Sequence, residues 1–190
     1  MPIARRRLAA PVTRRRLAAL ALPLLALPAT ARAASRREID DAVGPALARL
    51  QEQDGTRILA ENAKAILVFP RIIRGGFVFG GQYGNGAMVE GSETTGYYNI
   101  AGASFGLQIG AQSYGLAMFI MTEAALEFFR KSQGWEIGTG PSVVALDAGL
   151  AGSMTSTTMS QDVYAVTFGQ TGLMAALTLD GQKISRITPE

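Results

Sequence analysis

The spacing of apolar residues changes along this chain from a helical period to an alternating one near residue 65. Between Ile39 and Leu50, apolar residues recur at intervals of three and four, which predicts an amphipathic helix over residues 35–51. Ser35 and Glu38 have the spacing of a capping box at its start, and Pro45 predicts a weak or kinked middle. A second, shorter helix is predicted over residues 56–64.

The first helix has two alternative roles. A helix that lies in a membrane interface usually presents a basic polar face. Here the polar face mixes the two signs, because it carries Glu38, Asp40, Asp41 and Glu52 together with Arg36, Arg37 and Arg49. The mixed charge favours packing against the rest of the domain over insertion into a membrane interface.

From Ala65 onward the pattern is that of β-strands. Apolar residues alternate at 77–79 and 107–111, and the continuous apolar run 116–121 predicts a strand buried on both faces. Thr122 is placed to cap a helix that Gly134 ends, and further strands are predicted at 141–146, 162–168 and 172–179, with a loop or exposed edge at 154–160. The predicted fold is α+β: a strongly curved antiparallel sheet or barrel-like core, with the N-terminal helix and the 122–131 helix packed on it.

The first 33 residues have the layout of a signal peptide. Two arginine clusters, 5–7 and 14–16, precede an apolar run at 17–27, and Ala31-Arg32-Ala33 supplies a small-x-small cleavage site. The run is shorter than the roughly 20 residues that span a bilayer. We expect cleavage between Ala33 and Ala34; the alternative is an uncleaved interfacial anchor. Residues 34–190 then form a single domain.

The export route is predicted from Thr13-Arg14-Arg15-Arg16-Leu17-Ala18, which resembles the twin-arginine motif but lacks its usual phenylalanine and lysine. The general secretory route is the alternative. Either route delivers a periplasmic or secreted protein.

Removal of this segment reverses the net charge. It holds seven of the 18 Lys and Arg residues and none of the 15 acidic ones, so the remainder has 11 basic and 15 acidic residues and a charge of −4. A basic nucleic-acid footprint is therefore not expected. The chain has no cysteine, which rules out disulfides and a lipid-modified cysteine at the cleavage site.

The residues offer little for catalysis. The chain has no histidine or cysteine, its glycine runs do not match a phosphate-binding loop, and it contains no calcium-loop pattern. Asp147 and Asp162 flank a Ser/Thr-rich segment and are the one carboxylate pair worth considering as an acid–base pair. We expect no enzymatic activity, no cofactor and no metal site.

Several glycine-rich segments, taken in order, resemble the SYLF domain, a lipid-binding module also called the yeast actin-binding type domain. The resemblance extends over about residues 56–186 and rests on Ala63–Pro70, the Gly75-Gly76-Phe77 and Gly80-Gly81 pair of turns, Gly84-Asn85-Gly86, Phe105–Ala111 and Val166–Leu173 with Gly181. One loop departs from the family, since Tyr97-Tyr98-Asn99-Ile100-Ala101 lacks the usual tryptophan and proline.

The resemblance implies a bacterial exported member that binds lipid, as eukaryotic members bind phosphoinositides. The residues add a candidate site, the basic cluster Arg57, Lys64, Arg71 and Arg74, because anionic membrane surfaces attract such clusters. The alternative for this cluster is a solvated rim that offsets nearby acids. Trp135 has two readings, a bilayer-interface anchor or a residue that closes the core, and the core is favoured.

The function predicted is non-catalytic binding of membrane phospholipid, with anionic or phosphoinositide-like headgroups. The alternative is a structural protein of the cell envelope that binds another protein, not identified by the sequence, at an exposed sheet edge.

Overall fold

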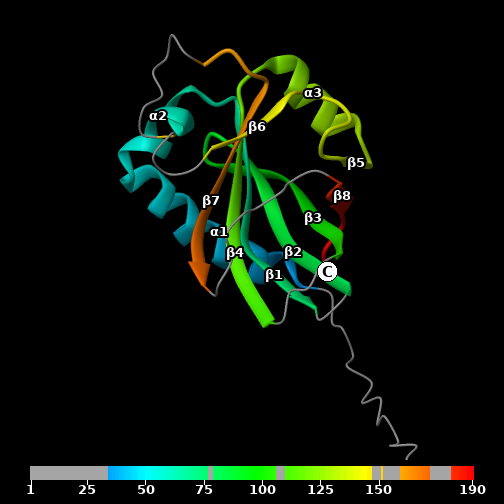
Figure 1. Ribbon diagram of the computed structural model, residues 1–190. Helices are drawn as coiled ribbons and strands as arrows, with labels where there is room; N and C mark the ends of the chain where they lie inside the picture. Colours follow the sequence, from blue (N-terminus) through cyan, green and yellow to red (C-terminus); the bar gives the residue numbers. More distant parts are fainter. Residues whose placement is uncertain (1–33, 77–78, 106–109, 147–150, 152–158, 172–180) are drawn as a thin grey trace, which may run out of the picture. The chain divides into compact units, whose positions relative to one another are not determined.

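In the computed structural model (Figure 1), the first helix, α1 (Arg36–Glu52), begins at the predicted capping box. The Ser35 backbone N–H donates to Glu38 Oε2 at 2.8 Å, and the Ser35 hydroxyl accepts from the Glu38 N–H at 3.3 Å. Pro45 lies inside this helix. The structure describes residues 34–76, 79–105, 110–146, 151, 159–171 and 181–190, all within one compact unit, Ala33–Glu190. The predicted signal peptide lies outside the described residues.

Two further helices follow along the chain, and only the second of these has a side-chain N-cap. The helix α2 (Asp54–Asn62) is tied to the end of α1 by the buried Thr56, whose hydroxyl donates to the Leu50 carbonyl. The helix α3 (Glu123–Lys131) has the predicted cap, since the Thr122 hydroxyl accepts from the Ala125 N–H at 3.3 Å. It ends at Lys131, with Ser132 as its C-cap, before the predicted stop at Gly134. None of the helices in the described ranges has the length and apolar character needed to cross a membrane.

Eight strands form one mixed sheet that curls into a half-barrel (Figure 1). They are β1 (Ala65–Gly76), β2 (Phe79–Glu90), β3 (Glu93–Phe105), β4 (Gly110–Ile120), β5 (Gly134–Glu136), β6 (Val143–Leu146), β7 (Val163–Thr171) and β8 (Lys183–Ile187). Their order is β5-β8-β3-β2-β1-β4-β7-β6.

The α+β class and the curved sheet are confirmed, with several local corrections. The sheet is not wholly antiparallel, because β6 and β7 run parallel. Residues 147–162 between them give the length that a parallel connection needs. The predicted loop at Tyr97–Ala101 is part of β3, and Gly80 and Gly81 lie in β2 rather than in a turn. The strands β5 and β8 were not predicted, and the predicted strand at 172–179 lies outside the described residues.

A β-bulge in β1 gives the sheet a local bend. Phe69 and Pro70 together oppose Gly86 of β2, and Pro70 and Arg71 together oppose Gly115 of β4. Proline lacks the N–H that a regular ladder uses, which suits it to a bulge. A Cβ atom at Gly86 would lie 2.1 Å from the Val68 carbonyl oxygen. Glycine therefore lets β2 approach the bulge closely.

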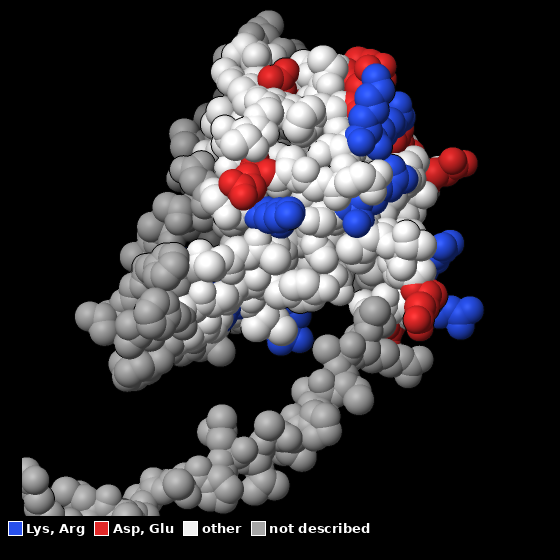
Figure 2. Space-filling view, turned by 90° about the vertical axis from the view of Figure 1, so that its right-hand side faces the viewer, with Lys and Arg blue, Asp and Glu red and all other residues white. Residues whose placement is uncertain are grey.

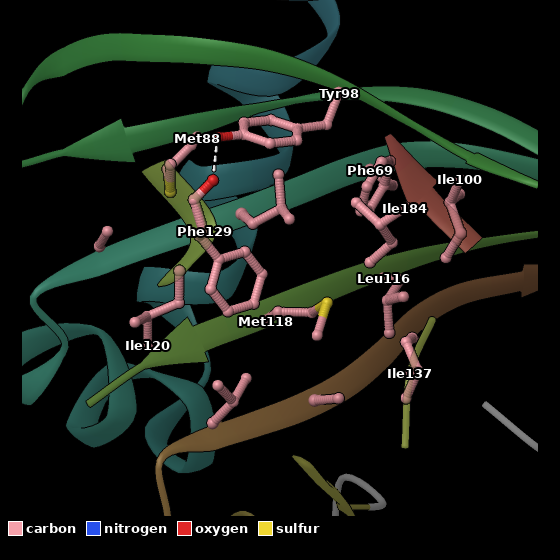
Figure 3. Packing of buried hydrophobic residues seen from close by; sticks show 14 of the residues in the cluster. Phe69, Met88, Tyr98, Ile100, Leu116, Met118, Ile120, Phe129, Ile137 and Ile184 are labelled. Atoms are coloured by element: carbon pink, nitrogen blue, oxygen red, sulfur yellow. Dashed lines mark hydrogen bonds between the residues drawn. The ribbon is translucent and has the colours of Figure 1, made fainter. Parts of the chain in front are cut away.

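The sheet has an inner and an outer apolar face. On the inner face, Trp135 near one edge and Val163 and Ala165 near the other belong to a single cluster, which requires the sheet to curl toward that side. Figure 3 shows this cluster, with Phe129 of α3 directed toward Met118 and the Tyr98 hydroxyl donating to the Phe129 carbonyl at 3.4 Å. Trp135 closes the core, because it is 6% exposed and its ring centroid lies 4.7 Å from that of Phe129.

On the outer face, α1 and α2 cover part of the sheet. Ile39, Val43, Ala46 and Leu50 of α1 pack with residues of β1, β2, β4 and β7, among them Val68, Ala87, Phe119 and Tyr164. The first helix therefore packs on the domain, as the mixed charge of its polar face predicted.

Candidate functional site

The four predicted basic residues do not share one surface. Arg57, on α2, is paired with Asp54 at 2.7 Å and with Glu61 at 4.0 Å, and all three side chains are exposed. Exposed pairs of this kind contribute little stability. Lys64 is exposed immediately before β1, where its backbone N–H donates to the Ile120 carbonyl at 2.8 Å.

Arg71 and Arg74 lie on opposite faces of β1. Ile72 belongs to the inner cluster, so Arg74, two residues later, also points inward, whereas Arg71 and Ile73 point outward. Burial follows the same alternation: Arg71 and Ile73 are exposed, and Arg74 is only 9% exposed. The structure thus separates two residues that the sequence placed in one cluster.

Arg74 belongs to a line of polar residues across the inner face. It directly opposes Gln82 of β2 on one side and Gln112 of β4 on the other, and Gln82 in turn opposes Gly102 of β3. Tyr114 and Gln182 complete the group, which we call the inner polar row: Arg74, Gln82, Gln112, Tyr114 and Gln182.

Tyr114 links two other neutral members of the inner polar row, Gln82 and Gln182. The Tyr114 hydroxyl donates to Gln82 Oε1 at 2.9 Å and is also hydrogen-bonded to Gln182. Burial raises the pKa of Tyr114 to about 12, although the positive charge of Arg74 and the bond to Gln182 act in the opposite direction. Tyr114 is therefore a neutral phenol at neutral pH.

Within the described part of the chain, Arg74 has no carboxylate partner. Its Nε is buried without a hydrogen bond, and none of the ion pairs among the described residues includes it. Gln112 Oε1 is likewise buried without a hydrogen bond. A buried cation normally has a carboxylate or a ligand beside it, because transferring an unpaired charge out of water is unfavourable.

The outer side of the same strand segment is apolar and exposed. Ile73 of β1 and Tyr83 of β2 are direct cross-strand neighbours, and each is 52% exposed. The Tyr83 hydroxyl donates to Asn85 Oδ1 at 2.8 Å, and Asn85 is the cross-strand neighbour of Arg71. We call Arg71, Ile73 and Tyr83 the outer patch.

The hydrogen bonds of Asp162 indicate a structural role and not that of an acid–base catalyst. Its Oδ1 accepts from the Thr122 hydroxyl at 3.0 Å, and its Oδ2 accepts from the Ser142 N–H at 3.1 Å and the Ser142 hydroxyl at 3.0 Å. The bonds from Ser142 and Thr122 lower the pKa of this carboxyl. Asp147 lies outside the described residues. Among the described residues, no group of three or more acidic side chains is arranged to hold a metal ion.

Charges of both signs mix over the face on the β5 and β8 side of the molecule (Figure 2). Arg130 of α3 donates to both carboxylate oxygens of Glu90 on β2, and these bonds lower the pKa of Glu90. Lys131 pairs with Glu127 at 2.9 Å. Arg130 and Lys131 are therefore matched with acids, unlike Arg74.

The glutamines of the inner polar row escaped the sequence analysis. Counting basic residues within a short window grouped Arg71 with Arg74 and ignored the faces to which they belong. The two-residue spacing from Ile72 to Arg74, and from Gln112 to Tyr114, contained the signal. It could be used only once the strand register was known.

A comparison with protein-family models gives a match over the second half of the chain. The family model Ysc84, described as Las17-binding protein actin regulator, matches residues 101–188. The matched region contains Gln112, Tyr114 and Gln182 of the inner polar row, whereas Arg74, Gln82 and the outer patch precede it. No protein with a curated description matches the chain.

Proposed function

Because residues 101–188 carry a domain of the Ysc84 (SYLF) family, as the resemblance predicted, we propose that this protein binds anionic phospholipid at a membrane surface. The SYLF domain is a binding module rather than a catalytic one. The proposal is therefore recognition of headgroups and of the apolar zone beneath them, without a chemical step.

The observation that carries this proposal is the outer patch. Ile73 and Tyr83 offer apolar surface that the described helices leave open, and Arg71 places a cation beside it. A tyrosine is suited to the membrane interface, where its ring meets acyl chains and its hydroxyl meets water. A cation near an anionic surface contributes about 1 kcal/mol.

We assign different weights to the remaining basic residues. Lys64 is exposed and supports binding as a second cation. Arg57 contributes less, because its charge is offset by Asp54 and Glu61. Arg74 faces inward and is therefore not part of the outer patch.

The test is vesicle co-sedimentation of residues 34–190, which hold every described element. Vesicles of phosphatidylglycerol in phosphatidylcholine should pellet the protein, and pure phosphatidylcholine should not. Changing Arg71→Glu together with Ile73→Ser should reduce pelleting at least about tenfold. Arg37→Glu on α1 is the matched control for charge, since Arg37 is also exposed and an acid is favourable in a first helical turn. Equal pelleting of both variants would reject the outer patch, and no pelleting by the unchanged protein would reject the function.

Salt provides an independent check. Binding that depends on exposed cations weakens as ionic strength rises, because the screening length falls from about 10 Å at 0.1 M to about 3 Å at 1 M. We expect most of the pelleting to be lost between these concentrations. Pelleting that does not change with salt would indicate that Ile73 and Tyr83 act without Arg71.

Because the matched family is described as Las17-binding, the alternative of a protein-binding role is tested alongside. The two edge strands, β5 and β6, have three and four residues. Edges this short offer few free backbone groups to an added strand. Stable capture of one protein by residues 34–190, together with indifference to every vesicle, would favour this alternative.

We also propose export, with Ala34 as the first residue of the mature protein and a periplasmic or secreted location. Ser35 begins the capping box of α1, so cleavage after Ala33 would leave every described element whole. The mass of the protein recovered from its own host tests this directly. An intact N-terminus would reject cleavage.

A further inference from the structure

We propose that the inner polar row is a binding site for one phosphate-type oxyanion, held by the Arg74 guanidinium and the amides beside it. This inference deepens the proposed function and rests on it for the source of the anion, a lipid headgroup. Free phosphate offers the same chemistry, and the experiment below separates the two sources.

The first observation is the position of Arg74 within the sheet. Its charge is nine-tenths buried on the inner face, two residues beyond Ile72, which is wholly buried. The guanidinium group presents a planar fork of donors that matches the geometry of a phosphate. Its Nε, one of these donors, is buried and unused.

The second observation is the chemistry around Arg74. Its direct cross-strand neighbours are two glutamines, and no described carboxylate is paired with it. A structural arginine at this depth would be expected to face an acid, because an unpaired charge is unfavourable out of water. Even Arg130, whose side chain is 46% exposed, is paired with Glu90. The neutral lining leaves the positive charge available to an incoming anion.

The third observation is that the lining can supply further donors. Gln112 Oε1 is buried without a partner, and an amide can turn to present its NH₂ group in the same volume. Gln82 is already held by Tyr114, so it lines the site in a fixed position. Gly102 lies beside it, where an added Cβ would be 3.3 Å from Gln82 Nε2 and 3.4 Å from Gln182 Cγ.

The location agrees with a headgroup as the source. The inner polar row and the outer patch occupy the same end of β1 and β2, since Arg74–Gln82 and Ile73–Tyr83 are successive cross-strand pairs. One strand segment therefore offers apolar contact on its outer side and an anion site on its inner side.

The experiment uses the full chain, so that residues 1–33 are the same in every variant and cancel in comparisons. Arg74→Gln removes the charge, and Gln112→Glu supplies an internal carboxylate opposite Arg74. Arg37→Gln on α1, an exposed arginine outside both the outer patch and the inner polar row, is the matched control. The unfolding midpoint is measured with inorganic phosphate and with glycerol 3-phosphate against chloride at equal ionic strength, and vesicle pelleting is measured with phosphatidylglycerol.

We expect a tenfold excess of phosphate over its Kd to raise the midpoint of the unchanged protein by about 3–5 °C. Arg74→Gln and Gln112→Glu should abolish this rise, and Arg37→Gln should keep it. Without phosphate, Gln112→Glu should unfold at a higher temperature than the unchanged protein, because it gives Arg74 a partner. This variant keeps the test decisive if Arg74→Gln does not fold.

Two results would overturn the site. The first is a phosphate-dependent rise in the unfolding midpoint that persists in Gln112→Glu. The second is a midpoint of the unchanged protein that neither phosphate probe raises, together with normal vesicle pelleting of Arg74→Gln. A phosphate response that needs Arg74, with pelleting unaffected by Arg74→Gln, would support the site and identify free phosphate as its ligand. A loss of pelleting of about tenfold or more would support it and identify the headgroup. If no variant pellets, the proposed function fails, and the phosphate arm still decides the inner site.

Discussion

The same residue types are buried on the inner face of β1 and exposed on its outer face. Ile72 is wholly buried and Ile73 is half exposed; Arg74 is buried and Arg71 is exposed. Neither hydrophobicity nor charge separates these pairs, because each contains identical residues. What differs is the side of the sheet, and therefore whether a side chain supports the fold or is available to a partner.

The largest expected effect contrasts the two isoleucines. Ile72→Ala should lower the free energy of unfolding by about 4 kcal/mol, because it leaves a cavity in the inner cluster. Ile73→Ala should change it by no more than about 0.5 kcal/mol and should instead weaken vesicle binding. Urea unfolding of both variants measures the first quantity. Similar losses of stability would mean that the outer patch is part of the core.

The second prediction concerns the β1 bulge, which determines which side chains after it point to the inner face and which to the outer face. Gly86→Ala should lower the free energy of unfolding by about 3 kcal/mol, because the added Cβ would collide with the Val68 carbonyl. Gly44→Ala is the control: it lies in α1, where a Cβ meets nothing within 4 Å. That change should stabilise the protein by up to about 1 kcal/mol. A Gly86→Ala variant of normal stability would argue against the close approach at the bulge.

The third prediction compares the side-chain hydrogen bonds that attach α3 and α1 to the rest of the domain. Asp162→Asn should cost about 1–2 kcal/mol at neutral pH, because the carboxylate accepts charge-assisted bonds at the start of α3. On the outer face, Asp40 accepts from Tyr97 at 2.9 Å and from Thr94 at 3.3 Å, and Asp40→Asn provides the parallel measurement. Thermal unfolding of the two variants compares the polar links of α3 and α1.

The pH dependence of the Asp162 contribution has a definite sign. Its pKa is lowered in the folded protein, so its stabilisation is complete above the unfolded pKa of about 3.9 and is lost as the pH falls through the lower, folded value. The difference between the unchanged protein and Asp162→Asn should therefore shrink below about pH 4. A difference that is constant down to pH 2 would contradict this role.

The smallest expected effect concerns Arg130, a cation that is paired with Glu90. Glu90→Gln should lower stability by less than about 1 kcal/mol, since the Arg130 side chain is 46% exposed and water can replace the lost bond. It should leave the phosphate response of the inner polar row unchanged. A loss of that response would connect the two arginine environments, which the structure keeps apart.

Much of the fold could be predicted because its signals are local. The Ser35 capping box, the Thr122 cap and the run at 116–121 depend only on neighbours in the sequence, and all three were confirmed. The strands β5 and β8 were missed for a different reason. The three residues of β5 are too short to show a period, and β8 is defined by its pairing with β3 and β5.

The site was harder to predict because side-chain direction depends on long-range register. Without the bulge, alternation along β1 would have placed Arg74 outside and Arg71 inside. The neutrality of the Arg74 surroundings depends on Gln82 and Gln112, eight and 38 positions away in the chain. Neither the bulge nor these partners leaves a pattern within a short window.

The bulge at Pro70 also bears on how related chains should be aligned. At this bulge, two residues of β1 oppose a single glycine on each neighbouring strand. A related chain that lacks the extra residue would keep each later side chain of β1 on the same face of the sheet as here. A one-residue gap elsewhere in β1 would turn the rest of the strand over. Relatives that differ in length within this strand should therefore differ at Pro70, and an alignment that puts the gap elsewhere would exchange core positions for surface ones.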